Sequence, residues 1–378
     1  MPQNPLLTLQ EFGQSMWLDS ISRQIIRDAL QPLIARDGLR GITSNPTIFE
    51  KAVAGSRDYD ELIRALASEG RRDAEIMDAL VVEDIQRTCD ALRPVYDRLR
   101  GQDGFVSIEV SPALAYDAPG TLDEARRLWQ WVNRPNLFVK IPGTEPGLSA
   151  IEAATSEGIS VNITLLFAVS RYEQVVEAYL RGLERRVQAH QPIDRIQSVA
   201  SFFVSRVDTV VDQQLETKAK AASDAKARQH IESLYGQAAI ANAKLAYRSF
   251  KQLHGSARFL KLKTSGANAQ RVLWASTSTK NPRYRDVIYV EELIGPHTVN
   301  TMPAATIDAF RDHGRARASL EEDVRGAEER VRQLQTLGID LARITRELET
   351  DGVKKFSDSM ASLLREIASK RDVILHHR

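Results

Sequence analysis

The chain has 378 residues, of which 43% are hydrophobic and 27% are charged, a composition typical of an ordinary globular protein. Lys plus Arg total 51 and Asp plus Glu total 50, and this near-balance argues against a general binder of nucleic acid or other polyanions. It leaves room for a small local phosphate pocket. The single cysteine, Cys89, excludes a disulfide framework within the chain and a cysteine-based metal site.

Neither a signal peptide nor a membrane helix is predicted. The first five residues, Met-Pro-Gln-Asn-Pro, lack a basic region followed by an apolar one. The longest stretches free of Asp, Glu, Lys and Arg are Leu293–Ile307 and Gly158–Ser170. Both contain polar residues and fall short of the roughly 18 apolar residues that a membrane helix needs. We therefore expect a cytoplasmic protein that does not bind a membrane.

Short β-rich runs alternate with helical runs along the chain. The predicted strands are Ser15–Leu18, Gly41–Thr43, Phe105–Val110, Asn136–Ile141, Ile159–Leu165, Ser198–Val204, Arg271–Ala275 and Val287–Val290. Helical spacing lies between most of them; for example, Ala125, Leu128, Trp129 and Val132 fall on one helical face. Strands that alternate with such helices indicate βαβ units and a parallel sheet.

Eight strands in this alternation favour a closed (β/α)8 TIM barrel, with an open doubly wound sheet as the alternative. A barrel needs roughly 250 residues, so the rest of the chain is available for additional peripheral helices. We assign these additions to the Ala-rich stretch around 209–253 and to the charged stretch 306–378. Both are predicted to pack on the outside of the barrel, within a single domain that spans residues 1–378.

Polar residues stand at or just after the ends of the predicted strands, which is where a barrel presents its catalytic groups. Each lies in or next to an apolar run, and burying such a group is costly unless it meets a partner or a ligand. In chain order the series is Asp19, Asn45, Glu109, Lys140, Asn162, Thr164, Ser201 and Arg206.

Lys140 lies inside a strand of large apolar residues, Leu-Phe-Val-Lys-Ile-Pro. Desolvation of an ammonium group lowers its pKa from about 10.4, and a neutral amine can attack a carbonyl carbon. The alternative is a lysine that leans out to solvent or makes a structural salt bridge inside the barrel. Lys261 and Lys263 also alternate with apolar residues, but two lysines on one face are more simply explained as a solvated face.

Asp19 and Glu109 are the candidate carboxylates. With a lysine nearby they could carry protons, although structural ion pairing with Lys140 is an equally simple explanation. Asn162 and Thr164 face the same way by the alternation of a strand, and a buried Asn needs hydrogen-bond partners. By itself, Asn45 before a proline indicates only a turn.

No phosphate-binding loop, no G-x-G-x-x-G pattern and no H-E-x-x-H pattern occurs. The seven histidines are scattered along the chain. The sequence therefore predicts neither a nucleotide site nor a metal site, and we expect no cofactor.

Taken together, these segments resemble transaldolase over nearly the whole chain. Their order and joint presence are specific to that family, and the length of the chain is similar to its longer bacterial subfamily, within the class I aldolase superfamily. The matching segments are Gly-Gln-Ser-Met-Trp-Leu-Asp (13–19), Gly-Ile-Thr-Ser-Asn-Pro-Thr-Ile-Phe-Glu-Lys-Ala (41–52), Val-Ser-Ile-Glu-Val-Ser-Pro (106–112), Leu-Phe-Val-Lys-Ile-Pro (137–142), Gly-Ile-Ser-Val-Asn-Ile-Thr-Leu-Leu-Phe (158–167), Val-Ala-Ser-Phe-Phe-Val-Ser-Arg-Val-Asp (199–208) and Leu-Trp-Ala-Ser-Thr (273–277).

The resemblance implies an aldolase-type mechanism without metal or cofactor. It identifies Lys140 as the Schiff-base lysine that attacks C2 of a ketose phosphate, such as fructose 6-phosphate or sedoheptulose 7-phosphate. It identifies Asp19 as the base that takes the C4 hydroxyl proton. Glu109 and Thr164 match the pair that orients a water molecule for proton transfer while the Schiff base forms and hydrolyses.

The resemblance also implies the binding residues. The groups that hold the dihydroxyacetone hydroxyls match Asn45, Asn162 and Ser201, and Arg206 matches a phosphate-binding arginine. After Trp274 the chain departs from the family, because several transaldolases place a serine and an arginine there for the phosphate. Here Ser278 is followed by Lys280 in place of the arginine, and a lysine supplies a point charge without the bidentate fork. We expect Ser278 and Lys280 to contribute to the phosphate site.

The implied activity is transfer of a dihydroxyacetone unit from either ketose phosphate to glyceraldehyde 3-phosphate or erythrose 4-phosphate, in the non-oxidative pentose phosphate pathway. The expected partners are sugar phosphates, not nucleic acid, and the chain is expected as a homodimer or a monomer.

Three alternatives stay open. Related aldolases that cleave fructose 6-phosphate are shorter and carry glutamine in place of Glu109. A barrel isomerase would use Glu109 as its base and would not need Lys140. A non-catalytic sugar-phosphate binder is compatible with the same fold.

Overall fold

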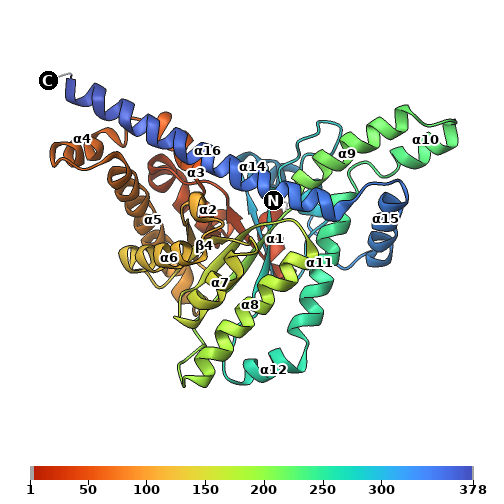
Figure 1. Ribbon diagram of the computed structural model, residues 1–378, viewed down its shortest axis with the longest axis horizontal. Coiled ribbons are helices and arrows are strands. Elements are labelled where there is room, and N and C mark those ends of the chain that lie inside the picture. The colour runs from red at the N-terminus through yellow and green to blue at the C-terminus, as the bar shows by residue number, and fades with distance from the viewer. Residues whose placement is uncertain (1–3, 377–378) are drawn as a thin grey trace.

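Eight parallel strands close into a barrel in sequence order, and the last strand pairs with the first. This computed structural model describes residues 4–376 and confirms the predicted (β/α)8 barrel with additional helices (Figure 1). The strands are β1 (Gln14–Leu18), β2 (Gly41–Ile42), β3 (Phe105–Glu109), β4 (Leu137–Pro142), β5 (Val161–Leu166), β6 (Ser198–Phe203), β7 (Arg271–Ala275) and β8 (Thr298–Met302).

Helices follow most of the strands and form the outer layer. They are α1 (Pro5–Glu11), α2 (Leu30–Asp37), α3 (Pro46–Ala54), α4 (Asp60–Ser68), α5 (Asp73–Arg98), α6 (Ala118–Val132), α7 (Gly147–Ser156), α8 (Val169–Gln188), α9 (Ser205–Lys220), α10 (Ala225–Glu232), α11 (Ala238–His254), α12 (Ala257–Thr264), α13 (Ile288–Glu291), α14 (Ala304–His313), α15 (Val324–Thr336) and α16 (Leu341–His376). A π-helical turn, Ile25–Ala29, precedes α2, and a 3-10 turn, Pro112–Leu114, follows β3.

Residues 1–3 and 377–378 lie outside the described part of the chain. The prediction that no signal peptide is present rests partly on the first three, and the predicted helical stretch 306–378 includes the last two. Within residues 4–376, none of the helices has the length and apolarity needed to cross a bilayer.

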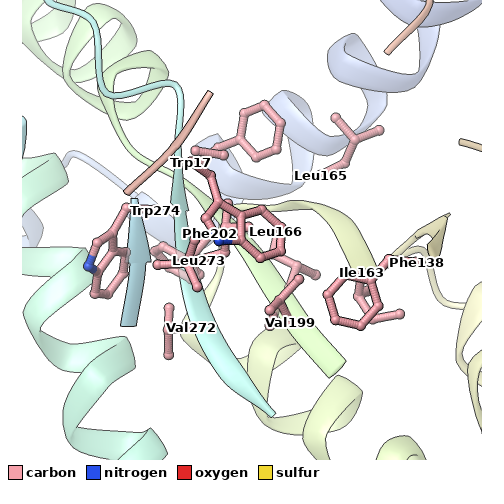
Figure 2. Packing of buried hydrophobic residues seen from close by; sticks show 14 of the residues in the cluster. Trp17, Phe138, Ile163, Leu165, Leu166, Val199, Phe202, Val272, Leu273 and Trp274 are labelled. Atoms are coloured by element: carbon pink, nitrogen blue, oxygen red, sulfur yellow. The ribbon is translucent and has the colours of Figure 1, made fainter. Parts of the chain in front are cut away.

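An aromatic layer fills the interior of the barrel below its carboxyl end. The rings of Phe105 and Phe138 stack at 4.2 Å, and Trp17 stacks on Phe138 at 6.1 Å (Figure 2). A Cβ at Gly41 would lie 2.4 Å from the indole of Trp17, so the ring is accommodated only because β2 carries a glycine there. The layer lies directly below the polar side chains that follow along the same strands, such as Asp19 after β1 and Lys140 in β4.

The amino end of the barrel is closed by a buried polar cluster. Asp103, 1% exposed, accepts hydrogen bonds from the hydroxyl of Ser15 and, at 2.9 Å, from Nε1 of Trp17. Arg271 lies 3.4 Å from the same carboxylate and donates to Ser15 at 2.9 Å. Both carboxylate oxygens of Asp103 therefore have partners, as a buried charge requires.

An irregularity in β5 links the barrel to the C-terminal helix. The register with β6 shifts between Ile163 and Leu166, and Leu165 has a φ of 61°, in the left-handed region. Such a bulge redirects a side chain, and Leu165 lies against α16 (Figure 2). A Cβ at Gly352 would lie 2.8 Å from Leu165 Cδ2, so the glycine lets the helix approach closely.

The predicted strand Val287–Val290 is wrong. These residues lie in and next to the short helix α13, and the eighth strand is β8, which the sequence analysis missed. All five residues of β8 are buried, but Thr298, Asn300 and Thr301 are polar. The strand therefore has a weak hydrophobic signal, whereas Val-Ile-Tyr-Val has a strong β-propensity that its surroundings override.

The predicted helical additions are present, and one of them also contacts a strand of the barrel. The stretch 209–253 forms most of α9 together with α10 and α11, and 306–378 contains most of α14, then α15 and α16. Figure 1 shows α16 as a long blue helix that spans the molecule, and it packs on α3, α4, α5, α9 and β5. In addition to these helices of the outer layer, α16 contacts β5, which the sequence did not indicate, because an amphipathic pattern shows that a face is buried without showing against what.

Replacing Asp103 with Ala should lower the free energy of unfolding by about 3–5 kcal/mol, because the positive charge of Arg271 and the indole N–H of Trp17 would lose a buried partner. Urea denaturation measures this change. Asp97, in an exposed pair with Arg93, provides the control, and its replacement with Ala should cost about 1 kcal/mol or less. Equal effects of the two substitutions would contradict a structural role for the Asp103 cluster.

Candidate active site

The carboxyl ends of the strands surround a cavity of about 330 Å³. Among the residues predicted from the sequence, those that line it are Asp19, Asn45, Lys140, Thr164, Ser201, Arg206, Ser278 and Lys280. Glu109 and Asn162 do not line it and lie behind its wall, next to Lys140 and Ser201 respectively. The other lining residues are Thr43, Thr47, Ile48, Lys51, Phe203, Ala275, Ser276, Thr301, Pro303 and Phe356.

The side chain of Lys140 is buried and ends at this cavity. The residue is 4% exposed, which excludes the alternative that it leans out to solvent. Its Nζ donates to Glu109 Oε2 at 3.0 Å and to the backbone carbonyl of Ser44 at 3.1 Å. The predicted ion pair with Glu109 therefore exists, but it leaves the amine within reach of a molecule bound in the cavity.

Glu109 pairs with Lys140 because β3 and β4 place these two residues side by side in register. The Glu109 side chain is 3% exposed, and burial raises its pKa, an effect that the charge of Lys140 opposes. Within the described chain, Glu109 Oε1 and Thr164 Oγ1 are buried and have no hydrogen-bond partner. Such orphan oxygens are the groups that an ordered water satisfies, and Glu109 also borders a second cavity of about 50 Å³.

Asp19 follows β1 and lines the same cavity as Lys140. Burial raises its pKa, while a 2.7 Å hydrogen bond from Thr43 Oγ1 and the charges of Lys140, Arg206 and Lys280 oppose that rise. The Thr43 hydroxyl also contacts Thr301 of β8 at 2.7 Å. A carboxylate with a raised pKa beside a lysine is suited to accept a proton near neutral pH.

The two predicted asparagines differ in what they can offer a ligand. Asn45 caps α3 by accepting from the backbone N–H of Ile48 at 3.0 Å, so its amide Nδ2 is the group available at the cavity wall. Asn162 is fully buried and donates to Ser107 at 3.0 Å. It also accepts from the Ser201 hydroxyl at 2.7 Å, so it orients Ser201 from behind.

One side of the cavity is cationic. Arg206 lies in the first turn of α9, and its Nη1 is buried with no hydrogen-bond partner among residues 4–376. Lys280 donates to Ser278 at 2.7 Å, and its pKa is lowered by partial desolvation and then by the neighbouring charge of Arg206, with a further contribution from Lys51. A helix N-terminus, a buried guanidinium and two lysines favour a phosphate-like dianion here.

The loop that carries Ser278 and Lys280 is fastened to the helix that carries Arg206. The hydroxyl of Tyr284 donates to Asp212 at 2.6 Å, and that of Tyr289 donates to Asp208 at 2.8 Å. Both aspartates belong to α9, and burial raises the pKa of Asp208 to about 7. The spacing between the cationic groups is therefore set by contacts outside the cavity.

Sequence reasoning missed several cavity residues. Phe203 could have been found, because it faces the same way as Ser201 by strand alternation. Lys51 lies within a segment that carried the family resemblance, but its helix gives it no distinguishing environment. Thr301 belongs to the missed strand, and Phe356 reaches the cavity from α16. The competing lysines, Lys261 and Lys263, are exposed on α12 and do not line the cavity.

Over residues 4–376, no group of three or more His, Cys, Asp or Glu side chains is arranged to hold an ion. The cavity presents an amine, the carboxylate of Asp19, hydroxyls and cationic groups, which suit covalent attack on a carbonyl, proton transfer and binding of a phosphate group.

Replacing Arg206 with Ala should weaken the binding of inorganic phosphate roughly tenfold or more, because a charge-assisted hydrogen bond is lost. Isothermal titration calorimetry of the purified protein measures the affinity for inorganic phosphate. Lys263→Ala, on the exposed face of α12, removes one positive charge elsewhere and should leave the affinity unchanged. An equal loss in both variants would point to general electrostatic attraction and not to a site at Arg206.

Comparison with known proteins gives a consistent family. The family model described as Transaldolase/Fructose-6-phosphate aldolase matches residues 16–367. A protein named Transaldolase 2 from Nostoc punctiforme is 46% identical over 378 aligned residues, which cover 99% of both chains. Proteins named Transaldolase from Parafrankia sp. (47% identical, covering 96% of this chain and 97% of the relative) and Mycobacterium bovis (45%, covering 98% of both) are similarly close.

Proposed function

The chain belongs to the transaldolase/fructose-6-phosphate aldolase family, and we propose that it catalyses dihydroxyacetone transfer through a Schiff base on Lys140. The activity is that of a transaldolase, because relatives that match nearly the whole chain carry that name. The observation that carries the mechanism is the position of Lys140, a buried amine that opens into a cavity lined by Asp19 and by cationic groups.

The reaction begins when the Lys140 ammonium gives a proton to a base, for which the hydrogen-bonded Glu109 carboxylate is available, and the neutral amine attacks C2 of a ketose phosphate. Loss of water from the adduct gives an iminium, which withdraws electrons as a Lewis acid would. Asp19 then takes the proton of the C4 hydroxyl while the C3–C4 bond breaks. The electron pair of the C3–C4 bond moves into the iminium. An aldose phosphate leaves, and an enamine of dihydroxyacetone stays on Lys140.

The second half of the reaction reverses these steps with another aldehyde. The enamine carbon attacks the acceptor aldehyde, and the new hydroxyl recovers its proton from Asp19. Water then hydrolyses the iminium and releases the product ketose. Glu109 and Thr164 would support this step by holding a water for proton transfer, since each has a buried oxygen without a hydrogen-bond partner and Glu109 is bonded to Lys140.

The binding roles follow from the same geometry. Asn45 and Ser201 would hold the hydroxyls of the dihydroxyacetone unit, and Asn162 would contribute by orienting Ser201. Arg206, Ser278 and Lys280 would bind the phosphate. The substrates proposed are sedoheptulose 7-phosphate or fructose 6-phosphate as donor and glyceraldehyde 3-phosphate or erythrose 4-phosphate as acceptor.

The alternatives are less well supported. The transaldolase names of the full-length relatives, together with Glu109 where related aldolases carry glutamine, favour transfer over simple cleavage. An isomerase or a passive binder has no need of a buried amine aimed at the cavity. The cytoplasm is proposed as the location, since phosphorylated sugars are intracellular metabolites and the only cysteine, Cys89, is an unpaired, buried thiol. Whether the enzyme is a homodimer or a monomer stays a prediction.

Borohydride reduction with fructose 6-phosphate tests the mechanism. The wild type should carry a reduced, largely three-carbon adduct on Lys140, located by mass spectrometry of the peptide. Lys140→Ala should abolish both turnover and labelling, whereas Lys261→Ala should leave both unchanged, since Lys261 is exposed on α12. Labelling of Lys261 or Lys263 in place of Lys140 would overturn the site.

Asp19→Ala should behave differently from Lys140→Ala in the same experiment. Formation of the Schiff base at C2 does not require the C4 proton to leave, so labelling should persist. Cleavage should stall because no base takes the hydroxyl proton, and the adduct should keep all six carbons. A three-carbon adduct that forms at the wild-type rate would mean that another group is the base.

The pH dependence of kcat/KM should report the carboxylate of Asp19. The base must be ionised to accept a proton, and burial raises the pKa of Asp19. As the pH is lowered, activity should therefore begin to fall at a pH above the usual titration range of an aspartate. Thr43→Val removes a hydrogen bond that favours the ionised form, so the acid limb should move to higher pH. Thr155→Val, at a buried threonine of α7, is the control and should leave the limb in place. A limb that stays unchanged in Thr43→Val would exclude Asp19 as its origin.

A further inference from the structure

An aromatic ring from the C-terminal helix covers the amine of Lys140. The side chain of Phe356 lines the active-site cavity, and the residue is 4% exposed. Lys140 Nζ lies 5.6 Å from the centroid of its ring. The two hydrogen bonds of Nζ go to Glu109 and to the carbonyl of Ser44, so the ring is an apolar neighbour in addition to these partners.

Contacts on both sides of Phe356 hold the ring in place. Ser359, three residues further along α16, shares a 2.8 Å hydrogen bond with Thr47, which also lines the cavity. On the other side, Gly352 lets Leu165 of the β5 bulge pack closely on the helix. Leu165 directly follows Thr164, so the same irregular strand presents a hydroxyl to the cavity and supports the helix above it.

A second pair of contacts fixes the far end of the helix. Lys370 donates to the backbone carbonyl of Ser56 at 2.9 Å and pairs with Asp60 at 3.0 Å. Together with Thr47, these residues belong to α3, α4 and the segment between them, which follow the barrel strand β2. The helix is therefore tied to the rim of the cavity at several points, and Phe356 is part of a fixed wall.

The position of this wall matters for one intermediate in particular. After the aldose phosphate leaves, the enamine on Lys140 has two fates. It can attack an acceptor aldehyde, which is transfer. Alternatively, its carbon can take a proton from solvent to give an iminium, and water then adds at C2 and displaces the lysine amine. That sequence releases free dihydroxyacetone and is hydrolysis.

We propose that Phe356 is a specificity-determining residue that favours transfer over hydrolysis by excluding water from the side of Lys140 that faces α16. This inference rests on the proposed Schiff base. An apolar ring beside Lys140 gives water no hydrogen-bond partner at that position, so solvent reaches the enamine carbon and C2 of the iminium less readily from that side. The enamine therefore persists until an acceptor binds.

The test compares two rates in each variant. One is the release of dihydroxyacetone from fructose 6-phosphate without acceptor, and the other is transfer to erythrose 4-phosphate. Phe356→Ala should raise the ratio of release to transfer by about tenfold, because water gains access to Lys140; this corresponds to about 1.4 kcal/mol in the relative barriers. Phe356→Leu keeps an apolar side chain and should raise the ratio less. If the alanine variant fails to fold, the leucine variant decides alone.

Leu348→Ala is the matched control, because Leu348 is a buried residue of α16 that does not line the cavity. It should leave the ratio unchanged even if it lowers stability. An equal rise in Leu348→Ala would show that loosening of α16 is sufficient and would overturn the assignment to Phe356. An unchanged ratio in both Phe356 variants, with borohydride still labelling Lys140, would overturn this inference alone. Absence of labelling in the wild type would instead refute the proposed mechanism.

Discussion

The burial of one ammonium group, that of Lys140, organises the carboxyl end of the barrel. Moving such a charge out of water costs several kcal/mol unless it is paired and hydrogen-bonded. Glu109 and the carbonyl of Ser44 meet that requirement. Glu109 ends β3, which pairs with β4, and Ser44 follows β2, which pairs with β3. Glu109 then requires hydrogen-bond partners of its own. Glu109 is buried in turn, and its second oxygen has no partner, so the polar arrangement around Lys140 is incomplete until a water or a substrate enters.

The buried charged groups at the two ends of the barrel differ in how completely they are hydrogen-bonded. At the amino end, both oxygens of Asp103 have partners, and the charge of Arg271 lies beside them, so that cluster is closed and structural. At the carboxyl end, atoms of the charged residues Glu109 and Arg206 are buried without a hydrogen-bond partner in the described chain, as is the hydroxyl of Thr164. Neutral amides at the amino end, such as Gln14 and Gln270, also have a buried oxygen without a hydrogen-bond partner. A buried polar group without a partner is costly, and a native protein retains several together where a ligand completes them. Neither inward polar residues nor unpartnered atoms alone identify an active site; at the carboxyl end they coincide with charged groups and a cavity.

Much of this arrangement could be predicted from the sequence because it depends on strands. Period-two alternation and the rule that catalytic groups follow barrel strands bring the residues from Asp19 to Arg206 to one end. The failures share a physical cause. β8 forms although it is polar, because its neighbours β1 and β7 supply the pairing. Phe356 reaches the cavity because of where a distant helix docks, and no local pattern in α16 records that destination.

The proposed phosphate site shows how distant contacts can position a lysine where the resemblance to transaldolases leads us to expect an arginine. A lysine at position 280 cannot grip a phosphate with two parallel hydrogen bonds as an arginine does, so its usefulness depends on where its single charge is held. Lys280 is on a loop, and a loop by itself would spread that charge over many positions. The hydrogen bonds from Tyr284 and Tyr289 to two aspartates of α9 restrict the loop relative to the helix that carries Arg206. Ser278 then contacts the ammonium directly. The position of the Lys280 charge relative to Arg206 is thus restricted by the backbone and not by the lysine side chain. The two residues are held near each other because the segment that follows Lys280 is bonded to α9, the helix that carries Arg206.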